Sequence, residues 1–160
     1  MKDAQKMDSV DERILAELQR DGRATMADLA PRVGLTPTPC LRRVKRLEAS
    51  GIIRGYAALV DPAKVGRQLQ AFIEMKLQDH ADSTVQAFKK ALEKREEVVA
   101  CYFMTGEIDF LLHVMVPDME TFSQFSLKVL LKLPGVKDSR SSFVLDTLKP
   151  AFVAPMGRHA

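Results

Sequence analysis

The sequence predicts an α+β protein of two parts, and three observations support this prediction. Apolar residues recur at helical spacing before residue 60 and alternate in a strand-like way further along the chain. Of the 8 Phe and 2 Tyr, only Tyr56 precedes residue 60. The formal net charge of +3 arises in residues 1–60, because residues 61–160 carry equal numbers of basic and acidic side chains. We therefore expect a small helical part, followed by a sheet-containing part with a phenylalanine-rich core.

Composition limits the classes of protein to consider. A chain of 160 residues fits one domain or two small ones. No apolar run approaches the roughly 18 residues of a membrane span, so none is expected. The N-terminus, MKDAQKMDSVDE, lacks an apolar signal core, which indicates a cytoplasmic protein. Cys40 and Cys101 belong to no CxxC motif, and both are expected to be reduced thiols.

Two short helices are expected near the N-terminus. The first lies in SVDERILAELQRDGR and is capped by Ser9 or Asp8. The second lies in TMADLAPRVG, where Thr25 is the cap and Asp28 follows three residues later. Pro31 removes one backbone donor and crowds the preceding turn. The second helix is therefore expected to be short or kinked.

A third helix carries most of the local positive charge. It begins at Thr36 or Thr38, because prolines at positions 37 and 39 fit a first helical turn, and it runs to Ser50. Residues 36–56 contain five basic side chains and one acidic side chain. A basic patch of this kind indicates contact with a polyanion, although a solvated helix face is the structural alternative.

The apolar and basic residues of the third helix fall on different faces. At roughly 100° per residue, Leu41, Val44 and Leu47 form the expected core stripe. Arg42 and Arg46 lie near the centre of the opposite face, where arginine can pair with guanine. The flanking cations suit contacts to phosphate. The candidates for contact with double-stranded DNA are Thr36, Thr38, Pro39, Arg42, Arg43, Lys45, Arg46 and, beyond the helix, Arg54.

The connection between the second and third helices is short and contains Gly34, which predicts a helix-turn-helix. The following segment, GIIRGYAALV, forms either a small β wing or a strand that crosses back. These elements predict a winged helix-turn-helix domain in residues 1–60. A linker is expected in residues 61–68, where Pro62 and Gly66 interrupt any long element.

Residues 69–160 show the order strand, helix, strand, strand, helix, strand. The first strand lies in LQAFIEMKLQ, where apolar residues at odd positions alternate with mainly polar ones. The order βαββαβ predicts a ferredoxin-like domain, with two helices on one face of a four-stranded sheet. Because no helix covers the other face, that face is expected to pair with a second copy of the chain.

The turn in MTGEIDFLL joins the second and third expected strands. A tight turn alone explains its residues, because Gly106 supplies a positive φ and Asp109 bonds the backbone. Alternatively, the N–H groups around Gly106 hold a carboxylate, while Asp109 or Glu107 holds an ammonium group. Both interpretations of Asp109 remain open at this point.

The string VGLTPTPCLRRVKRLEASGIIRGYAALVDP, followed by the βαββαβ order and CYFMTGEIDFLLHV, resembles the leucine-responsive regulatory protein / AsnC family over about residues 8–150. Pro31 departs from the family pattern in the second helix. The resemblance implies a prokaryotic transcription regulator that binds DNA, dimerises, assembles further into octamers and binds a small effector, usually an amino acid. It also implies an effector site between subunits near the turn. The effector-binding candidates are Thr105, Gly106, Glu107, Ile108 and Asp109, with Ser141 and Ser142 on the last strand.

Two other functions are weighed against regulation by an effector. An enzyme is not expected, because the sequence shows no nucleophile–base arrangement and no phosphate-binding loop. Neither the histidines nor the cysteines stand at a metal-ligand spacing, so no metal and no cofactor besides the effector are expected. A DNA-binding protein that bends DNA without any effector remains an alternative.

Overall fold

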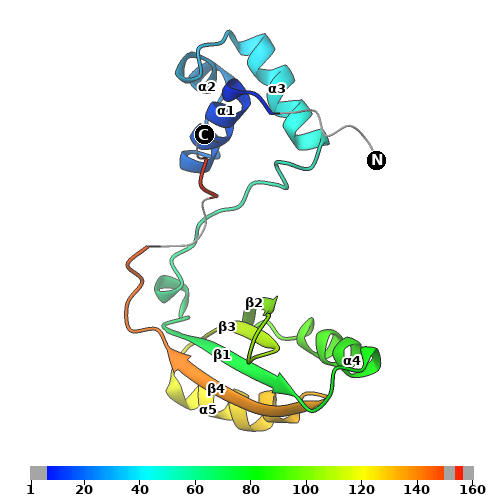
Figure 1. The fold of residues 1–160 in the computed structure, drawn as a ribbon. Helices are drawn as coiled ribbons and strands as arrows, with labels where there is room; N and C mark the ends of the chain where they lie inside the picture. Colours follow the sequence, from blue (N-terminus) through cyan, green and yellow to red (C-terminus); the bar gives the residue numbers. More distant parts are fainter. Residues whose placement is uncertain (1–6, 150–153, 157–160) are drawn as a thin grey trace. The chain divides into compact units, whose positions relative to one another are not determined.

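The chain folds into two compact units in a computed structural model that describes residues 7–149 and 154–156 (Figure 1). The first unit contains the residues up to Leu59, and the second contains Val60–Lys149. The first is helical, whereas the second holds a sheet and two α-helices. Within the described residues, no helix combines the length and apolar character that crossing a membrane requires.

Three helices build the first unit in the predicted order: α1 (Ser9–Arg20), α2 (Met26–Arg32) and α3 (Pro37–Ala49). Asp8 caps α1 and Thr25 caps α2, each with a capping box that satisfies backbone N–H groups of the first turn. Apolar side chains from all three helices form one core, so the short helices stabilise one another by packing.

Helix α2 is short, as predicted from its proline. It spans only 7 residues, and Pro31 lies next to its last residue. Gly34 then adopts a φ of 73°, a left-handed conformation that other residues rarely adopt. The N–H of Leu35 donates to the carbonyl of Ala30 across this turn. The turn therefore ends α2 and leads directly into α3.

The buried face of α3 differs from the predicted one. Cys40, Val44 and Leu47 are buried, whereas Leu41 is 39% exposed, so the prediction that Leu41 belongs to the core is wrong. Cys40 packs in the core in its place. Because successive residues are separated by 100°, replacing Leu41 with Cys40 rotates the core stripe by about 30°. Relative to the observed core, the basic residues of α3 therefore lie about 30° away from their predicted positions.

The segment between α3 and the sheet contains no strand among the described residues, so the expected wing or crossing strand is not seen in this chain. A strand needs a neighbour to accept its backbone hydrogen bonds, and the first unit contains only helices. The hydroxyl of Tyr56 instead donates to Glu48 of α3. A 3₁₀ turn at Ala63–Val65 and a left-handed Gly66 follow before the sheet begins.

Four strands form the sheet of the second unit: β1 (Leu69–Leu77), β2 (Val98–Phe103), β3 (Phe110–Val116) and β4 (Val136–Phe143). Their spatial order is β2-β3-β1-β4, and every neighbouring pair is antiparallel. Together with the connecting helices, this order gives the predicted ferredoxin-like topology.

Helices α4 (Asp82–Leu92) and α5 (Met119–Lys128) cover one face of the sheet, which we call the inner face. Buried side chains of both helices, among them Phe88 and Phe122, join the same core as the inner residues of β1 and β3. The alternation predicted for β1 is confirmed by the burial of its odd-numbered residues Ala71, Ile73, Met75 and Leu77.

The outer face of the sheet carries the even-numbered residues of β1, and none of the described helices packs on it. Phe72 of β1 stacks on His113 of β3, with ring centroids 4.6 Å apart and planes inclined by 14°. Gln70 lies 3.2 Å from the ring Nε2 of the same histidine. Partial burial lowers the pKa of His113, which favours its neutral form. This face is thus partly aromatic.

The last described residues, 154–156, belong to the first unit, although residues 69–160 were predicted to form the second domain. The side chain of Gln19 in α1 forms two hydrogen bonds with the backbone of Ala154. They measure 2.7 Å from the Ala154 N–H and 3.1 Å to its carbonyl. The side-chain amide of Gln19 both donates to and accepts from the backbone of Ala154. This pair of bonds explains why the segment lies against α1.

Candidate functional site

Two arginines of α3 are held by carboxylates at the start of α1. Arg43 Nη1 lies 2.7 Å from an oxygen of Asp8 and 2.9 Å from Asp11 Oδ1. Arg46 pairs with the other carboxylate oxygen of Asp11. We call Asp8, Asp11, Arg43 and Arg46 the Asp–Arg cluster. It ties the first helix of the unit to the helix that carries the predicted DNA contacts.

Asp11 is 0% exposed and is the only buried polar or charged residue among those the structure describes. It completes the capping box of α1: its N–H donates to Asp8 over 2.9 Å, and it accepts from the Asp8 N–H over 3.2 Å. A buried carboxylate is unfavourable unless it is paired and hydrogen-bonded. The two guanidinium groups supply that pairing.

The Asp–Arg cluster also changes the protonation equilibria of Asp8 and Arg43. The N–H of Asp11 and then the guanidinium of Arg43 lower the pKa of Asp8. Hydrogen bonds to Asp8 and Asp11 raise the pKa of Arg43. Both shifts favour the charged forms, so Asp8 and Arg43 stay charged at neutral pH.

The remaining basic candidates are turned outward. Arg42, Lys45 and Arg54 are exposed, and none of them forms an ion pair within the described part of the chain. Thr36 and Thr38 are exposed as well, and Pro39 is partly exposed, at the start of the same helix. Arg42 shares an open hollow of about 390 Å³ with two members of the Asp–Arg cluster, Arg43 and Arg46.

The structure therefore divides the predicted DNA-contact stripe into two groups. The rotation of the α3 core by about 30° leaves Arg42 and Lys45 opposite the core and brings Arg43 and Arg46 toward α1. Sequence reasoning placed Arg46 at the centre and missed its partner Asp11, and it also missed Asp8 and Asp11 as partners of Arg43. The three-residue spacing of Asp8 and Asp11 predicts a capping box, but nothing in the sequence predicts that they pair with arginines of α3.

The β2–β3 turn, residues 104–109, is closed by backbone hydrogen bonds at its ends. The N–H of Met104 donates to the carbonyl of Asp109, and the Asp109 N–H donates to the carbonyl of Met75. Gly106 has a φ of 108°, as expected from the glycine. Among the described residues, no hydrogen bond engages the N–H groups of Thr105, Gly106, Glu107 or Ile108.

The side chain of Asp109 fastens this turn to the end of β1. One carboxylate oxygen accepts from the N–H of Leu77 over 2.7 Å, and the other lies 2.6 Å from Nε2 of His80. Burial acts to raise the pKa of Asp109. The bonds from Leu77 and His80, together with the charges of His80 and Lys76, outweigh burial and lower it. His80 was missed as part of this site, because no sequence signal connects it to the turn.

Ser141 and Ser142 are not brought to the turn within one chain. Ser141 pairs with Ile73 and Ser142 with Phe72, whereas the turn is bound to Leu77. A separation of four residues along a strand corresponds to roughly 13 Å. Since consecutive strand residues point to opposite faces, the two serines also cannot line one site together in a single chain.

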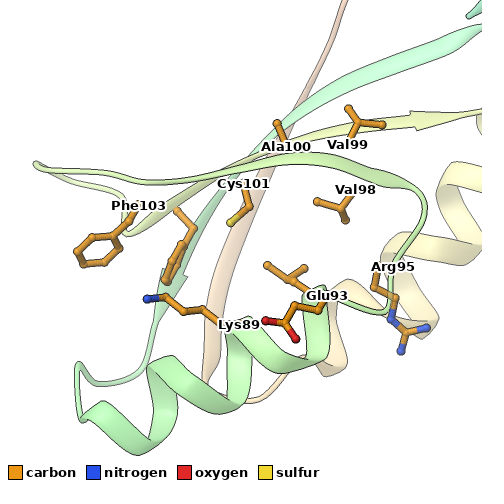
Figure 2. A pocket seen from close by; sticks show the side chains of 10 residues that line it. Lys89, Glu93, Arg95, Val98, Val99, Ala100, Cys101 and Phe103 are labelled. Atoms are coloured by element: carbon orange, nitrogen blue, oxygen red, sulfur yellow. The ribbon is translucent and has the colours of Figure 1, made fainter. Parts of the chain in front are cut away.

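A groove of about 470 Å³ lies between α4 and the edge strand β2 (Figure 2). Lys89 of α4 and Glu93, just after the helix, line one side, and Cys101 and Phe103 line the other side from the strand. Partial burial raises the pKa of Cys101, although Lys89 acts in the opposite direction. The thiol is therefore not activated as a nucleophile. Across the described residues, no group of three or more His, Cys, Asp or Glu could hold a metal ion.

A helix-turn-helix with an outward basic face, joined to a ferredoxin-like unit, defines the class of DNA-binding transcription regulators that carry a ligand-binding domain. Residues 7–54 match the family model for winged helix-turn-helix DNA-binding, and residues 70–153 match the model for the Lrp/AsnC ligand binding domain. The chain belongs to the Lrp/AsnC family. It is a transcription regulator and not an enzyme.

Individual relatives agree with this assignment. The chain is 43% identical to the leucine-responsive regulatory protein of Escherichia coli K12 over 143 residues, which cover 89% of this chain and 87% of the relative. It is 44% identical to a transcriptional regulator of Neisseria meningitidis solved in complex with L-Met, with a TM-score of 0.90 and coverage of 94% and 97%. An AsnC family transcriptional regulator from Agrobacterium tumefaciens is 35% identical, with a TM-score of 0.88 and the same coverage.

Proposed function

We propose that this regulator acts in the cytoplasm and that an amino acid bound at the β2–β3 turn controls its binding to DNA. The relative from Neisseria meningitidis was solved with L-Met, which supports an amino acid as the class of effector. The observation that carries the proposal is the run of exposed backbone N–H groups around Gly106 that have no hydrogen-bond partner within the described residues.

An α-amino acid offers two charged groups, and the turn offers a counterpart for each. The N–H groups of Gly106 and its neighbours suit the α-carboxylate, because successive N–H groups form anion-binding concavities. Glu107 is exposed and suits the α-ammonium group. Asp109 is engaged through both oxygens, so we assign it the role of shaping the turn. Thr105 and Ile108 flank these groups within the same turn.

The proposal includes a second copy of the chain on the outer face of the sheet. Phe72 is 38% exposed and Tyr102 is 53% exposed on this face, where no described helix packs. Exposed aromatic patches on a sheet favour association, and a two-fold axis would bury the same patch of both copies. The serines of β4 can then contribute to an effector site only from a neighbouring copy. Further assembly into octamers is part of the same proposal.

Effector and DNA binding are linked through assembly. Two recognition helices of a dimer fit a pseudo-palindromic site with half-sites about one helical turn apart. An effector can shift the balance between assemblies only through its different affinity for them. The same difference then appears as a change in DNA affinity. The ligand-binding unit thereby reports the amino acid concentration to the DNA-binding unit.

A thermal-shift screen against the twenty amino acids at millimolar concentration tests the effector. A ligand at about 100 times its dissociation constant stabilises the protein by roughly 2.7 kcal/mol. We expect a shift for one or a few related amino acids and its loss in Glu107→Gln. Glu93→Gln is the matched control, because it removes the same charge from the groove between α4 and β2.

Each outcome of the screen has a distinct meaning. Loss of the shift in Glu93→Gln alone would move the effector from the turn to the groove. No shift with any amino acid would contradict the proposal and favour a protein that bends DNA without an effector. In that case, DNA bending measured by permuted-site electrophoresis is the next experiment.

Light scattering tests the proposed dimer face. Phe72→Glu places a charge on the outer face and is expected to reduce the oligomer size. Phe103→Glu is the control, because Phe103 is 67% exposed but contacts Phe110 at the inner edge of the sheet. An equal reduction by both variants, or by neither, would contradict association through the outer face.

A further inference from the structure

The Asp–Arg cluster is electrically balanced although its two arginines lie on α3, the helix that the proposed function places against DNA. Its two carboxylates and two guanidinium groups carry a net charge of zero. Arg42 and Lys45 therefore remain as the helix α3 cations without an ion pair in the described part of the chain. The basic stripe attracts polyanions less than its four charges suggest.

The two paired arginines still have unused donors. Arg43 contacts both carboxylates through Nη1, and Arg46 contacts Asp11 through Nη2. A guanidinium has five N–H donors in a rigid fork, so each outer edge keeps donors for another acceptor. Both arginines, together with Arg42, line the open hollow on this side of the unit. Their outer edges are held in one direction by a carboxylate that is 0% exposed.

We propose that Asp11, which does not itself touch DNA, is a positioning residue that raises the selectivity of the regulator for its own site over random DNA. It acts in two ways. It fixes the direction in which Arg43 and Arg46 extend, and it cancels part of their attraction for any phosphate backbone.

The physical reason lies in the two parts of protein–DNA affinity. Attraction between basic side chains and phosphates is independent of sequence and dominates binding to random DNA. Sequence is read by side chains that reach base edges in a defined geometry. Fixed side chains lose less conformational entropy on binding to the correct site. A carboxylate beside them penalises every site where the geometry is imperfect, which is how repulsive elements increase specificity.

The test compares two duplexes: a site selected from a random pool by the wild-type protein, and a random sequence of equal length. Asp11→Asn keeps an oxygen for the capping box but removes the charge. We expect the Kd for the random duplex divided by the Kd for the selected site to fall about tenfold. This is the effect of losing one well-placed base contact. We also expect log Kd for random DNA to depend more steeply on log salt, by about 0.9, the contribution of one additional phosphate contact.

Two further variants separate positioning from folding. Asp28→Asn is the matched control, because Asp28 occupies the same position in the capping box of α2 and forms no ion pair among the described residues. It should leave both the ratio and the slope unchanged. Asp8→Asn preserves a good helix cap and removes one partner of Arg43, so it should shift both quantities in the direction of Asp11→Asn, by less.

Unchanged ratios and slopes in Asp8→Asn would overturn the proposal even if Asp11→Asn fails to fold. If Asp11→Asn folds and weakens both duplexes equally, Asp11 has a structural role only. Failure of the wild-type protein to select any site would instead contradict sequence-specific DNA binding itself, so the two failures are distinguishable.

Discussion

Asp11 in the helical unit and Asp109 in the sheet unit both bind the backbone through their carboxylates, but they pair with different side chains. Each accepts a backbone N–H and holds together segments that are distant in sequence. Asp11 is fully buried and paired with two arginines, whereas Asp109 is partly exposed and paired with His80. Both cations that pair with Asp11 are guanidinium groups, which stay charged at all physiological pH values. The DNA-binding side is thus fixed by ion pairs to a buried carboxylate, whereas the carboxylate on the effector side is partly exposed.

The largest expected effect tests the fixed side of this comparison. Asp11→Ala leaves two guanidinium groups without their buried partner, so the first unit should lose about 3 kcal/mol of unfolding free energy. Hydrogen exchange of the α1 and α3 amides measures this loss locally. Asp28→Ala, which breaks the equivalent capping box without breaking an ion pair, should cost clearly less. Equal losses in the two variants would show that the cap, and not the arginines, accounts for the role of Asp11.

The next effect concerns the anchor of the turn. Asp109→Ala leaves the N–H of Leu77 without its acceptor, and an unsatisfied buried donor costs about 1–3 kcal/mol. Hydrogen exchange at Leu77 should accelerate accordingly. The effector shift should disappear because the turn loses its shape. A retained effector shift in this variant would mean that the turn does not depend on its anchor.

A smaller effect is expected from pH. The folded-state pKa of Asp109 is lowered, so its stabilisation is complete above the pKa of the unfolded chain, about 3.9. It is lost as pH falls through the folded value, so stability should decrease below about pH 4. Acid titration of the second unit by circular dichroism measures this decrease. In Asp109→Asn that decrease should be smaller, and an identical titration curve would contradict the assignment to Asp109.

The smallest effect is expected from His80, the exposed partner of Asp109. His80 is 68% exposed, and exposed ion pairs contribute at most about 1 kcal/mol. His80→Gln should therefore leave the unfolding free energy nearly unchanged between pH 5 and 8, as measured by urea denaturation. A loss well above 1 kcal/mol would contradict a weak, exposed ion pair between His80 and Asp109.

Much of the fold was predictable from local patterns. The alternation in β1, the capping residues of α1 and α2, and the short second helix all follow from rules that act within a few residues. The core face of α3 was predicted less well, because Cys40 and Leu41 are both apolar and only packing decides between them. Choosing the wrong one rotated the whole stripe and placed Arg46 at its centre.

By itself, the sequence determined the order of elements, the ferredoxin-like topology, the basic third helix and the glycine turn. These depend on periodicity, capping and turn chemistry, which are local properties of a chain. Only the tertiary structure decided which charges are paired: Asp11 with two arginines 32 and 35 residues away, and Asp109 with His80. Ion pairing depends on distance in space, and the packing of helices and strands sets that distance, not their separation along the chain.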